Sequence, residues 1–509
     1  MLSTKIKTIL IALFIIVNII LRFQIVPHEI GVDSFDMHIM ANSISEFGYA
    51  NWILHPLSFF GLYPASYASS MQFLLSGISQ TTGIDMEWTI FVYTILIGII
   101  SIFTAYLMAG EIIDNELFKL SVAIGYSTAP AILDNTTWTI PARGLFMVLA
   151  PVLIYLLLKC RISVKYVLLT SVMSMLLFST HHLFYFLIPA FLSFFILLSF
   201  SKTNTFFQAI QIPKRFMLFL IIIGFFLMFS IPFFTGRFLE SSRYSPVYLG
   251  YVRYVGILMI PAISGLIYLM LEPKKSFGKW FLLLTVMFLI MFVFKQTYMK
   301  SFIPLFAIPL AGIGLLNVIK ISEKTKYARF IVVIFLVLSF SFSGYFQFLH
   351  SFDENPFNKR NIEEETYKAG QWIKVNLNGS AISNDKTFDM RIFSISGTIH
   401  LITVSTVENQ IYGFTNINIS DYKRYQFTDE NFWYSGYEGP DFGEKVWYEL
   451  NLLKISPNSL NITYFIENTK GEGNLIWNHK PEPSKLLNKA YGDGYLVYDG
   501  GKPRVWKLE

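Results

Sequence analysis

The residues best suited by type to take part in a reaction lie in Gly31-Val32-Asp33-Ser34-Phe35-Asp36-Met37-His38, directly after the first apolar segment. A carboxylate there could act as a general base, or hold a divalent cation against a phosphate. The plainer interpretation is that Asp33 caps a helix whose first turn contains Asp36 and His38, because acidic residues are common at helix N-termini.

The composition indicates a polytopic membrane protein. Of its 509 residues, 53% are hydrophobic and 15% are charged, whereas about a quarter of the residues in a soluble domain are charged. The net charge of +6 comes mostly from Lys and Arg in short loops, as membrane topology requires, and is not a nucleic-acid signature. The one cysteine, Cys160, leaves no intrachain disulfide to form.

Apolar runs near the length of a bilayer-spanning helix predict about 11 transmembrane helices. They cover residues 5–26, 87–108, 117–133, 143–159, 166–180, 183–200, 215–234, 251–271, 279–294, 302–318 and 330–350. Lys and Arg gather in the loops after the fourth, sixth, eighth and tenth runs, while residues 27–86 contain neither. The positive-inside rule therefore predicts a cytoplasmic N-terminus. The loop Gly110–Glu116 is an exception to this charge pattern, because it is acidic although it lies on the predicted cytoplasmic side.

We predict two parts: an α-helical membrane domain, 1–350, with a first outer loop at 27–86, and an extracytoplasmic mixed α/β domain, 351–509. In the loop, Phe35–Tyr49 has the pattern of an amphipathic helix that Gly48 ends. In the second part, Asn361–Leu377 predicts a helix capped by Asn361, and 399–407, 460–466, 494–498 and 504–507 predict strands. Four Asn-x-Ser/Thr sequons fall on the predicted outer side, at Asn135, Asn378, Asn418 and Asn461.

Cations on the predicted outer side run against the positive-inside tendency. They are Arg143, Arg237, Arg243, Arg253, Lys295 and Lys300. An anion at the outer leaflet, such as a lipid phosphate, is a physical reason to keep the set there. For any single one, interfacial snorkelling is the simpler explanation.

Acidic residues near these cations suggest a metal shell. Asp33 fits the role of base or metal ligand, and Asp36 and Glu240 could complete a shell for Mg²⁺ or Mn²⁺. Asp134 is a weaker candidate. Adjacent imidazoles do not point the same way, so His181-His182 is expected to cap or pack rather than bind metal.

The pattern resembles the GT-C superfamily of integral-membrane glycosyltransferases. The first outer loop of oligosaccharyltransferase catalytic subunits is similar to four parts of this chain: residues 31–38, Ile44-Ser45-Glu46-Phe47-Gly48, Trp52 and Tyr63-Pro64. Protein O-mannosyltransferases and lipid A aminoarabinose transferases share such an acidic loop. The resemblance implies that Asp33 is catalytic or binds metal, and that Glu240 matches the acid of the fifth outer loop. It also implies that residues 300–315 bring a basic residue to the lipid phosphate.

One motif departs from that family. Oligosaccharyltransferase subunits carry Trp-Trp-Asp in the C-terminal domain, where this chain has Phe432-Trp433-Tyr434 with no Asp following. We therefore expect a multi-pass cell-membrane glycosyltransferase that takes sugar from a polyprenyl-phosphate or -diphosphate donor. The missing motif argues against glycosylation of Asn in sequons as its reaction. Its acceptor is expected to be an extracytoplasmic protein or glycolipid.

Two alternatives from other classes stay open. A lipid-linked glycan transporter or flippase would show mid-membrane ionisable residues and repeat symmetry, and neither is clear in the sequence. A non-catalytic glycan-binding or envelope-assembly membrane protein would keep the fold and lose the need for Asp33.

Overall fold

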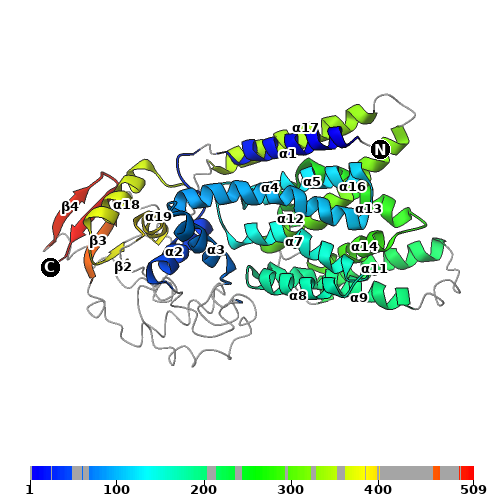
Figure 1. Ribbon diagram of the computed structural model, residues 1–509, viewed down its shortest axis with the longest axis horizontal. Helices are drawn as coiled ribbons and strands as arrows, with labels where there is room; N and C mark the ends of the chain where they lie inside the picture. Colours follow the sequence, from blue (N-terminus) through cyan, green and yellow to red (C-terminus); the bar gives the residue numbers. More distant parts are fainter. Residues whose placement is uncertain are drawn as a thin grey trace, which may run out of the picture.

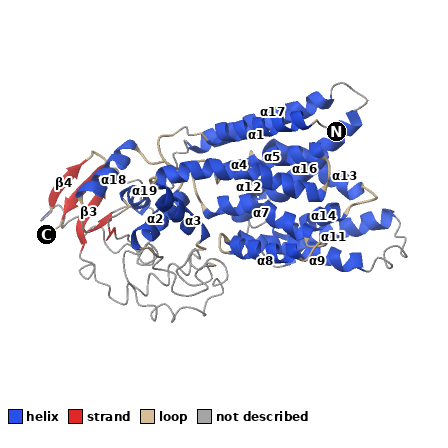
Figure 2. Cartoon of the chain, in the orientation of Figure 1, coloured by secondary structure: helices blue, strands red, loops and turns tan. Residues whose placement is uncertain are grey.

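The computed structural model describes residues 3–23, 26–48, 60, 68–202, 214–234, 244–292, 296–322, 328–351, 361–383, 386–397, 400–401, 462–469, 492 and 494–508. Helices run lengthwise through most of the molecule, and a smaller part with the strands lies at one end (Figure 1). We call this end the sheet end and the opposite one the far end. Figure 2 shows how strongly helix predominates among the described residues.

The bundle consists of long apolar helices with shorter ones at their ends. Its elements are α1 (Thr4–Arg22), α4 (Met86–Ile112), α5 (Glu116–Ser127), α6 (Pro130–Asp134), α7 (Ala142–Lys159), α8 (Lys165–Phe178), the 3₁₀ helix η2 (His182–Leu187), α9 (Ile188–Lys202), α11 (Lys214–Phe234), α12 (Tyr244–Val255), η3 (Gly256–Leu258), α13 (Met259–Leu271), α14 (Phe277–Leu289), η4 (Ile290–Phe292), α15 (Gln296–Phe302), α16 (Pro304–Ser322) and α17 (Ala328–Ser351). Each of the eleven predicted apolar runs carries a helix. The first and last of them, α1 and α17, lie side by side, with Leu10 and Ile11 in the same apolar cluster as Leu336 and Phe340 (Figure 1).

Five stretches of the described chain are long and apolar enough to cross a membrane. They are Thr4–Arg22, Met86–Ile112, Ala142–Lys159, His182–Phe200 and Gly250–Leu271. Shorter apolar helices cover Lys165–Phe178, Leu218–Met228, Phe277–Phe292, Pro304–Lys320 and Val333–Leu349. The multi-pass class is thus supported, while eleven crossings and their orientation stay predictions.

Ion pairs at the far end explain why the loop Gly110–Glu116 is acidic, in contrast to the other loops on the predicted cytoplasmic side. Glu111 pairs with Lys159, with 2.7 Å between Oε1 and Nζ, and Glu116 pairs with Lys7 at 3.0 Å. Lys119 pairs with Asp114 at 2.7 Å. The acids of this loop are therefore neutralised by cations of neighbouring helices.

The first loop forms a helix earlier than the sequence predicted. Helix α2 spans Val32–Phe47, so Gly31, not Asp33, is the N-cap, and Asp33 lies in the first turn. The prediction that Gly48 ends this helix is confirmed, because Gly48 adopts the left-handed conformation (φ 75°). Helix α3 (Ser70–Thr82) then packs beside α2 before α4 begins.

The C-terminal part is mixed α/β, as predicted. It comprises α18 (Glu364–Asn376), β1 (Ser380–Ser383), α19 (Lys386–Ser396), β2 (His400–Leu401), β3 (Ile462–Asn468), β4 (Tyr495–Asp499) and β5 (Pro503–Lys507). The strands form one sheet of order β2-β1-β3-β5-β4, parallel from β2 to β3 and antiparallel beyond. The four predicted strands correspond to β2, β3, β4 and β5, although most of 399–407 lies outside the described residues. The sequence missed β1 and α19.

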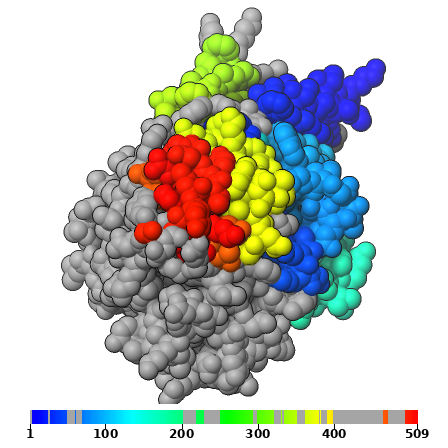
Figure 3. Space-filling view, turned by 90° about the vertical axis from the view of Figure 1, so that its left-hand side faces the viewer, coloured from blue at the N-terminus to red at the C-terminus, as the bar shows by residue number. Residues whose placement is uncertain are grey.

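One apolar core joins the two parts. Helix α19 packs on α2, and their buried residues share a cluster with the start of α4 and with Trp138. Asn361 does not cap α18 as predicted; Glu363 is the N-cap, and Asn361 forms a β-bridge with Ile30. Figure 3 shows the sheet end with the C-terminal strands beside α18 and α19, and N-terminal segments adjoining them.

Candidate functional site

Two hydrogen bonds hold the start of α2 against the loop before α7. The N–H of Ile30 donates to the carbonyl of Trp138 (3.0 Å), and the N–H of Ile140 donates to Ser34 Oγ (3.0 Å). Gly31 has φ 102°, and a Cβ there would lie 2.9 Å from Thr139 Oγ1. Only glycine suits such a conformation and such a close approach. This junction fixes the position of Asp33.

A buried polar network supports the same loop from the bundle side. The Arg22 side chain is fully buried and donates to Thr136 Oγ1 (3.1 Å), Asn18 Oδ1 (2.6 Å) and the Ser127 carbonyl (2.9 Å). A buried guanidinium is tolerated only when its N–H groups are hydrogen-bonded. Arg22 thus acts as a structural tie between α1, α5 and the loop that follows α6.

Asp33 and Arg143 form an ion pair at the sheet end. Arg143 is in the first turn of α7, and its Nη2 donates to Asp33 Oδ2. The Asp33 side chain is 57% exposed and that of Arg143 is 23% exposed. Both groups are therefore open to a ligand, and an ion pair this exposed adds little to stability.

Further cations share the electrostatic environment of Arg143. Burial lowers the pKa of Lys300, the Asp134 carboxylate opposes that shift, and Arg143 and Arg253 lower the pKa further. Lys300 Nζ lies 4.9 Å from the ring centre of Tyr254, and the Arg253 guanidinium lies 4.8 Å from that of Phe346. Three of the cations predicted to meet a phosphate are thus brought close enough to influence one another.

The His181-His182 pair lies beside this cluster. Burial, His182 and Arg143 all lower the pKa of His181. Nδ1 of His181 accepts a hydrogen bond from the N–H of Leu183 (3.0 Å), so it caps η2, as expected. The rings of His182 and Tyr298 meet edge-on, 4.4 Å apart.

The other predicted site residues divide into two groups. Asp36 is buried, at 8% exposure, one turn after Asp33. Arg237, Glu240, Arg243 and Lys295 lie outside the described residues. Among the residues that are described, no three of His, Cys, Asp or Glu converge as a metal shell would require. Asp33 and Asp36 are the described members of the predicted metal shell, and the metal role stays a prediction.

Sequence reasoning missed a second group of acids and imidazoles that flanks α2. His38 Nδ1 and Glu29 Oε1 share a hydrogen bond of 2.9 Å, and both residues are buried. His28 Nδ1 lies 3.0 Å from Glu87 Oε1, and its ring stacks on Tyr367 at 3.7 Å. In the sequence, this second group is indicated only by the adjacent titratable residues His28 and Glu29, which come just before the acidic stretch.

Comparisons with known proteins give structural similarity at low sequence identity. No protein-family model matches the chain, and no curated protein matches it. The chain is similar to the Archaeoglobus fulgidus oligosaccharyltransferase, at a TM-score of 0.48 and 12% identity, over 90% of this chain and 68% of that one. It is also similar to a mutant form of the arabinofuranosyltransferase AftD from Mycobacteria, at a TM-score of 0.45 and 14% identity, over 75% of this chain and 31% of that one.

Proposed function

We propose that this chain is a membrane glycosyltransferase that takes a sugar or oligosaccharide from a polyprenyl-phosphate or -diphosphate donor and passes it to an extracytoplasmic protein or glycolipid. In this proposal the sheet end faces the outside of the cell membrane and the N-terminus is cytoplasmic. Asp33 acts on the acceptor, with Asp36 assisting, and the cations bind the phosphate.

The observation that carries the proposal is an exposed carboxylate, Asp33, paired with Arg143 at the sheet end of an apolar bundle, where Arg143 also acts on the charge of Lys300. Asp33 contacts Arg143, and Arg143 and Arg253 both lower the pKa of Lys300. A bound anion offsets the repulsion between neighbouring cations and so stabilises their charged forms. A guanidinium also presents a fork of donors that matches phosphate oxygens.

The ion pair suggests how the donor would prepare the site. A phosphate that enters competes with Asp33 for the Arg143 guanidinium, because both are anions. Binding of the donor would then release the Asp33 carboxylate to take the proton of the acceptor nucleophile, or to hold a divalent cation.

Transfer of labelled sugar tests the proposal directly. Protein purified in detergent is offered polyprenyl-phosphate and polyprenyl-diphosphate sugars, with Asp33→Asn assayed in parallel. We expect transfer by the wild type from one donor class and a loss of about 10²- to 10⁴-fold in Asp33→Asn, the range typical of a general base. EDTA, with Mg²⁺ or Mn²⁺ added back, separates the base from the metal-ligand role.

A matched variant controls for the loss of a negative charge. Asp114→Asn makes the same change at the far end, where Asp114 pairs only with Lys119 among the described residues, and should leave transfer unchanged. Full activity in folded Asp33→Asn would remove Asp33 from the mechanism. No transfer by the wild type from either donor class would favour a non-catalytic glycan-binding role.

A further inference from the structure

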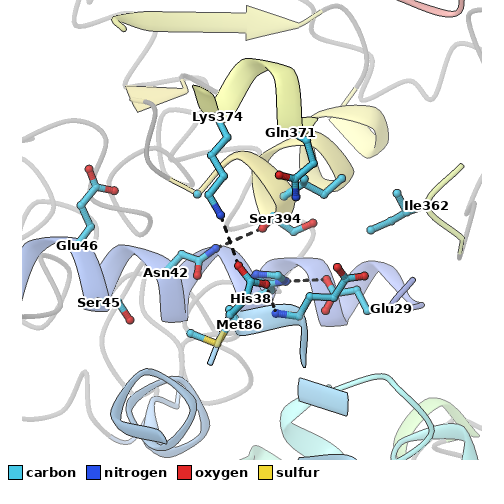
Figure 4. Close-up of a pocket in the computed structure, with 14 residues that line it drawn as sticks. Glu29, His38, Asn42, Ser45, Glu46, Met86, Ile362, Gln371, Lys374 and Ser394 are labelled. Carbon is cyan, nitrogen blue, oxygen red and sulfur yellow. Dashed lines mark hydrogen bonds and ion pairs between the residues drawn. The ribbon is translucent and has the colours of Figure 1, made fainter. Parts of the chain in front are cut away.

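A cavity of about 250 Å³ lies between the first loop and the C-terminal part, and its lining includes neither Asp33 nor Arg143. Helix α2, the first turn of α4, α18 and α19 all contribute to its lining (Figure 4). Pockets for drug-sized ligands have roughly 300–1,000 Å³, so this one suits a smaller molecule.

The cavity uses a different face of α2 from the proposed catalytic site. His38, Asn42 and Ser45 line it, at the spacing of one helical face. Asp33 and Asp36 each lie about 150° around the helix axis from the middle of that face. The two sites therefore share a helix but do not share residues.

Glu29 gives the cavity an unsatisfied buried acceptor. The residue is fully buried and lines the cavity, and its Oε1 is engaged by Nδ1 of His38 at 2.9 Å. Its Oε2 has no hydrogen-bond partner among the residues that the structure describes. An unpaired buried acceptor costs about 1–3 kcal/mol, and more when it is charged. A donor that entered the cavity would recover this energy.

The charges around the cavity favour a cationic donor. Glu46, Asp85 and Glu87 line it together with Glu29. Among the described residues of the lining, Lys374 is the one Lys or Arg, and its Nζ is 3.5 Å from Asp85 Oδ2. The negative charges of Asp85 and Glu87 act on Glu29, since both raise its pKa. Among the described residues of the lining, carboxylates thus outnumber Lys and Arg.

The geometry distinguishes among cations. A guanidinium pairs best with both oxygens of a carboxylate, and here one oxygen of Glu29 is already taken by His38. An ammonium is a compact point charge that needs a single acceptor. A divalent cation needs several converging ligands, and no such group of His, Cys, Asp or Glu exists among the described residues.

We propose that this cavity binds the primary ammonium group of a small organic ligand, which donates to Glu29 Oε2 while Asn42, Gln371 and Ser394 contact the rest of the molecule. An ethanolamine headgroup and an amino sugar share this chemistry.

Matched pairs of ligands test the proposal on the full-length protein in detergent. Saturation-transfer NMR compares ethanolamine with ethylene glycol, and glucosamine with glucose, so that each pair differs by an ammonium in place of a hydroxyl. We expect binding of at least one amine and at least about tenfold weaker binding of its neutral partner, because a hydrogen bond to a charged group is lost. Which amine binds more tightly distinguishes a lipid headgroup from a sugar.

Variants locate the binding at Glu29. Glu29→Gln should weaken amine binding by about tenfold or more, while Glu365→Gln, an exposed position on α18 that does not line the cavity, should leave it unchanged. Glu46→Lys changes an exposed residue of the lining and should weaken amine binding severalfold. This variant tests the proposal if Glu29→Gln does not fold. Equal binding of amine and neutral partner, no binding of either amine, or binding unaffected by these lining variants would overturn the proposal.

Discussion

The guanidinium of Arg143 donates to the carboxylate of Asp33, which lies 110 residues earlier in the chain. The contact joins the first turn of α2 to the first turn of α7. It exists because Ile30 and Ser34 are hydrogen-bonded to the loop that leads into α7. A carboxylate and a guanidinium so placed at the sheet end are the centre of the proposed transfer site.

Replacing Arg143 should affect donor binding far more than stability. We expect Arg143→Gln to raise the KM for the lipid donor about ten- to a hundredfold, since a hydrogen bond to a charged group is worth about 1.5–3 kcal/mol. The Tm should change little, because the pair is partly exposed. Arg161→Gln, beyond the other end of α7, is the matched control and should leave KM unchanged. An unaltered KM in Arg143→Gln would exclude this residue from phosphate binding.

Two glycines with positive φ separate backbone strain from site geometry. Gly31→Ala and Gly48→Ala should each lose about 1–2 kcal/mol of stability to an unfavourable backbone conformation. Only Gly31→Ala should also reduce transfer, because its Cβ would lie 2.9 Å from Thr139 Oγ1 and push α2 away from the α7 loop, whereas nothing lies within 4 Å at Gly48. Transfer assays and thermal unfolding of both variants check this. Equal activity in the two would show that the junction does not position Asp33.

The tie made by Arg22 should be sensitive to one methyl group. A Cβ at Gly98 would lie 2.2 Å from Arg22 Nε, so Gly98→Ala must displace the guanidinium from its partners. We expect a loss of about 1–3 kcal/mol, typical of overpacking, seen as a lower Tm. Gly77→Ala, in α3 with open space around it, should instead be neutral or slightly stabilising. A Tm for Gly98→Ala as high as that of Gly77→Ala would contradict the packing described.

The buried Glu29–His38 pair should make stability fall as pH rises. Burial raises the pKa of Glu29 above its ordinary 4.5. Burial opposes protonation of His38, but the charge and hydrogen bond of Glu29, together with the charges of Asp85 and Glu87, outweigh it and raise the pKa of His38 above its ordinary 6.5. Both shifts mean that the folded pair keeps a proton that the unfolded chain releases above about pH 6.5. The stabilisation is therefore present at lower pH and lost as the pH rises through the folded pKa.

Thermal unfolding at about pH 5.5 and about pH 8 measures this dependence. The wild type should lose more Tm over that interval than a Glu29→Gln/His38→Gln variant, in which neither group titrates. One unit of pKa shift corresponds to about 1.4 kcal/mol. Parallel pH profiles for the two proteins would mean that the pair does not hold the extra proton.

Much of the architecture is written in local patterns. Apolar runs such as Met86–Ile112 mark membrane helices, because backbone in lipid must satisfy its own hydrogen bonds. Asp499-Gly500-Gly501, between β4 and β5, has the residue types of a turn, and Gly501 adopts φ 82° there. The start of α2 has no such local signal, because a glycine N-cap leaves no side-chain signature.

What surrounds each residue was decided only by the tertiary structure. The sequon at Asn135 falls on the predicted outer side, but Asn135 itself is buried and its amide donates to the Ala131 carbonyl at 2.8 Å. Glu29 and Lys374 carried no mark of a shared cavity, since they are far apart in sequence and meet only when α18 and α19 dock on α2.

The sequence by itself determined the membrane class, the mixed α/β C-terminal part, and the acid and cations that belong near one another by charge. The fold decided which of them meet. Local preferences act over a few residues, whereas the pairing of Asp33 with Arg143 and the burial of Glu29 depend on how distant segments pack.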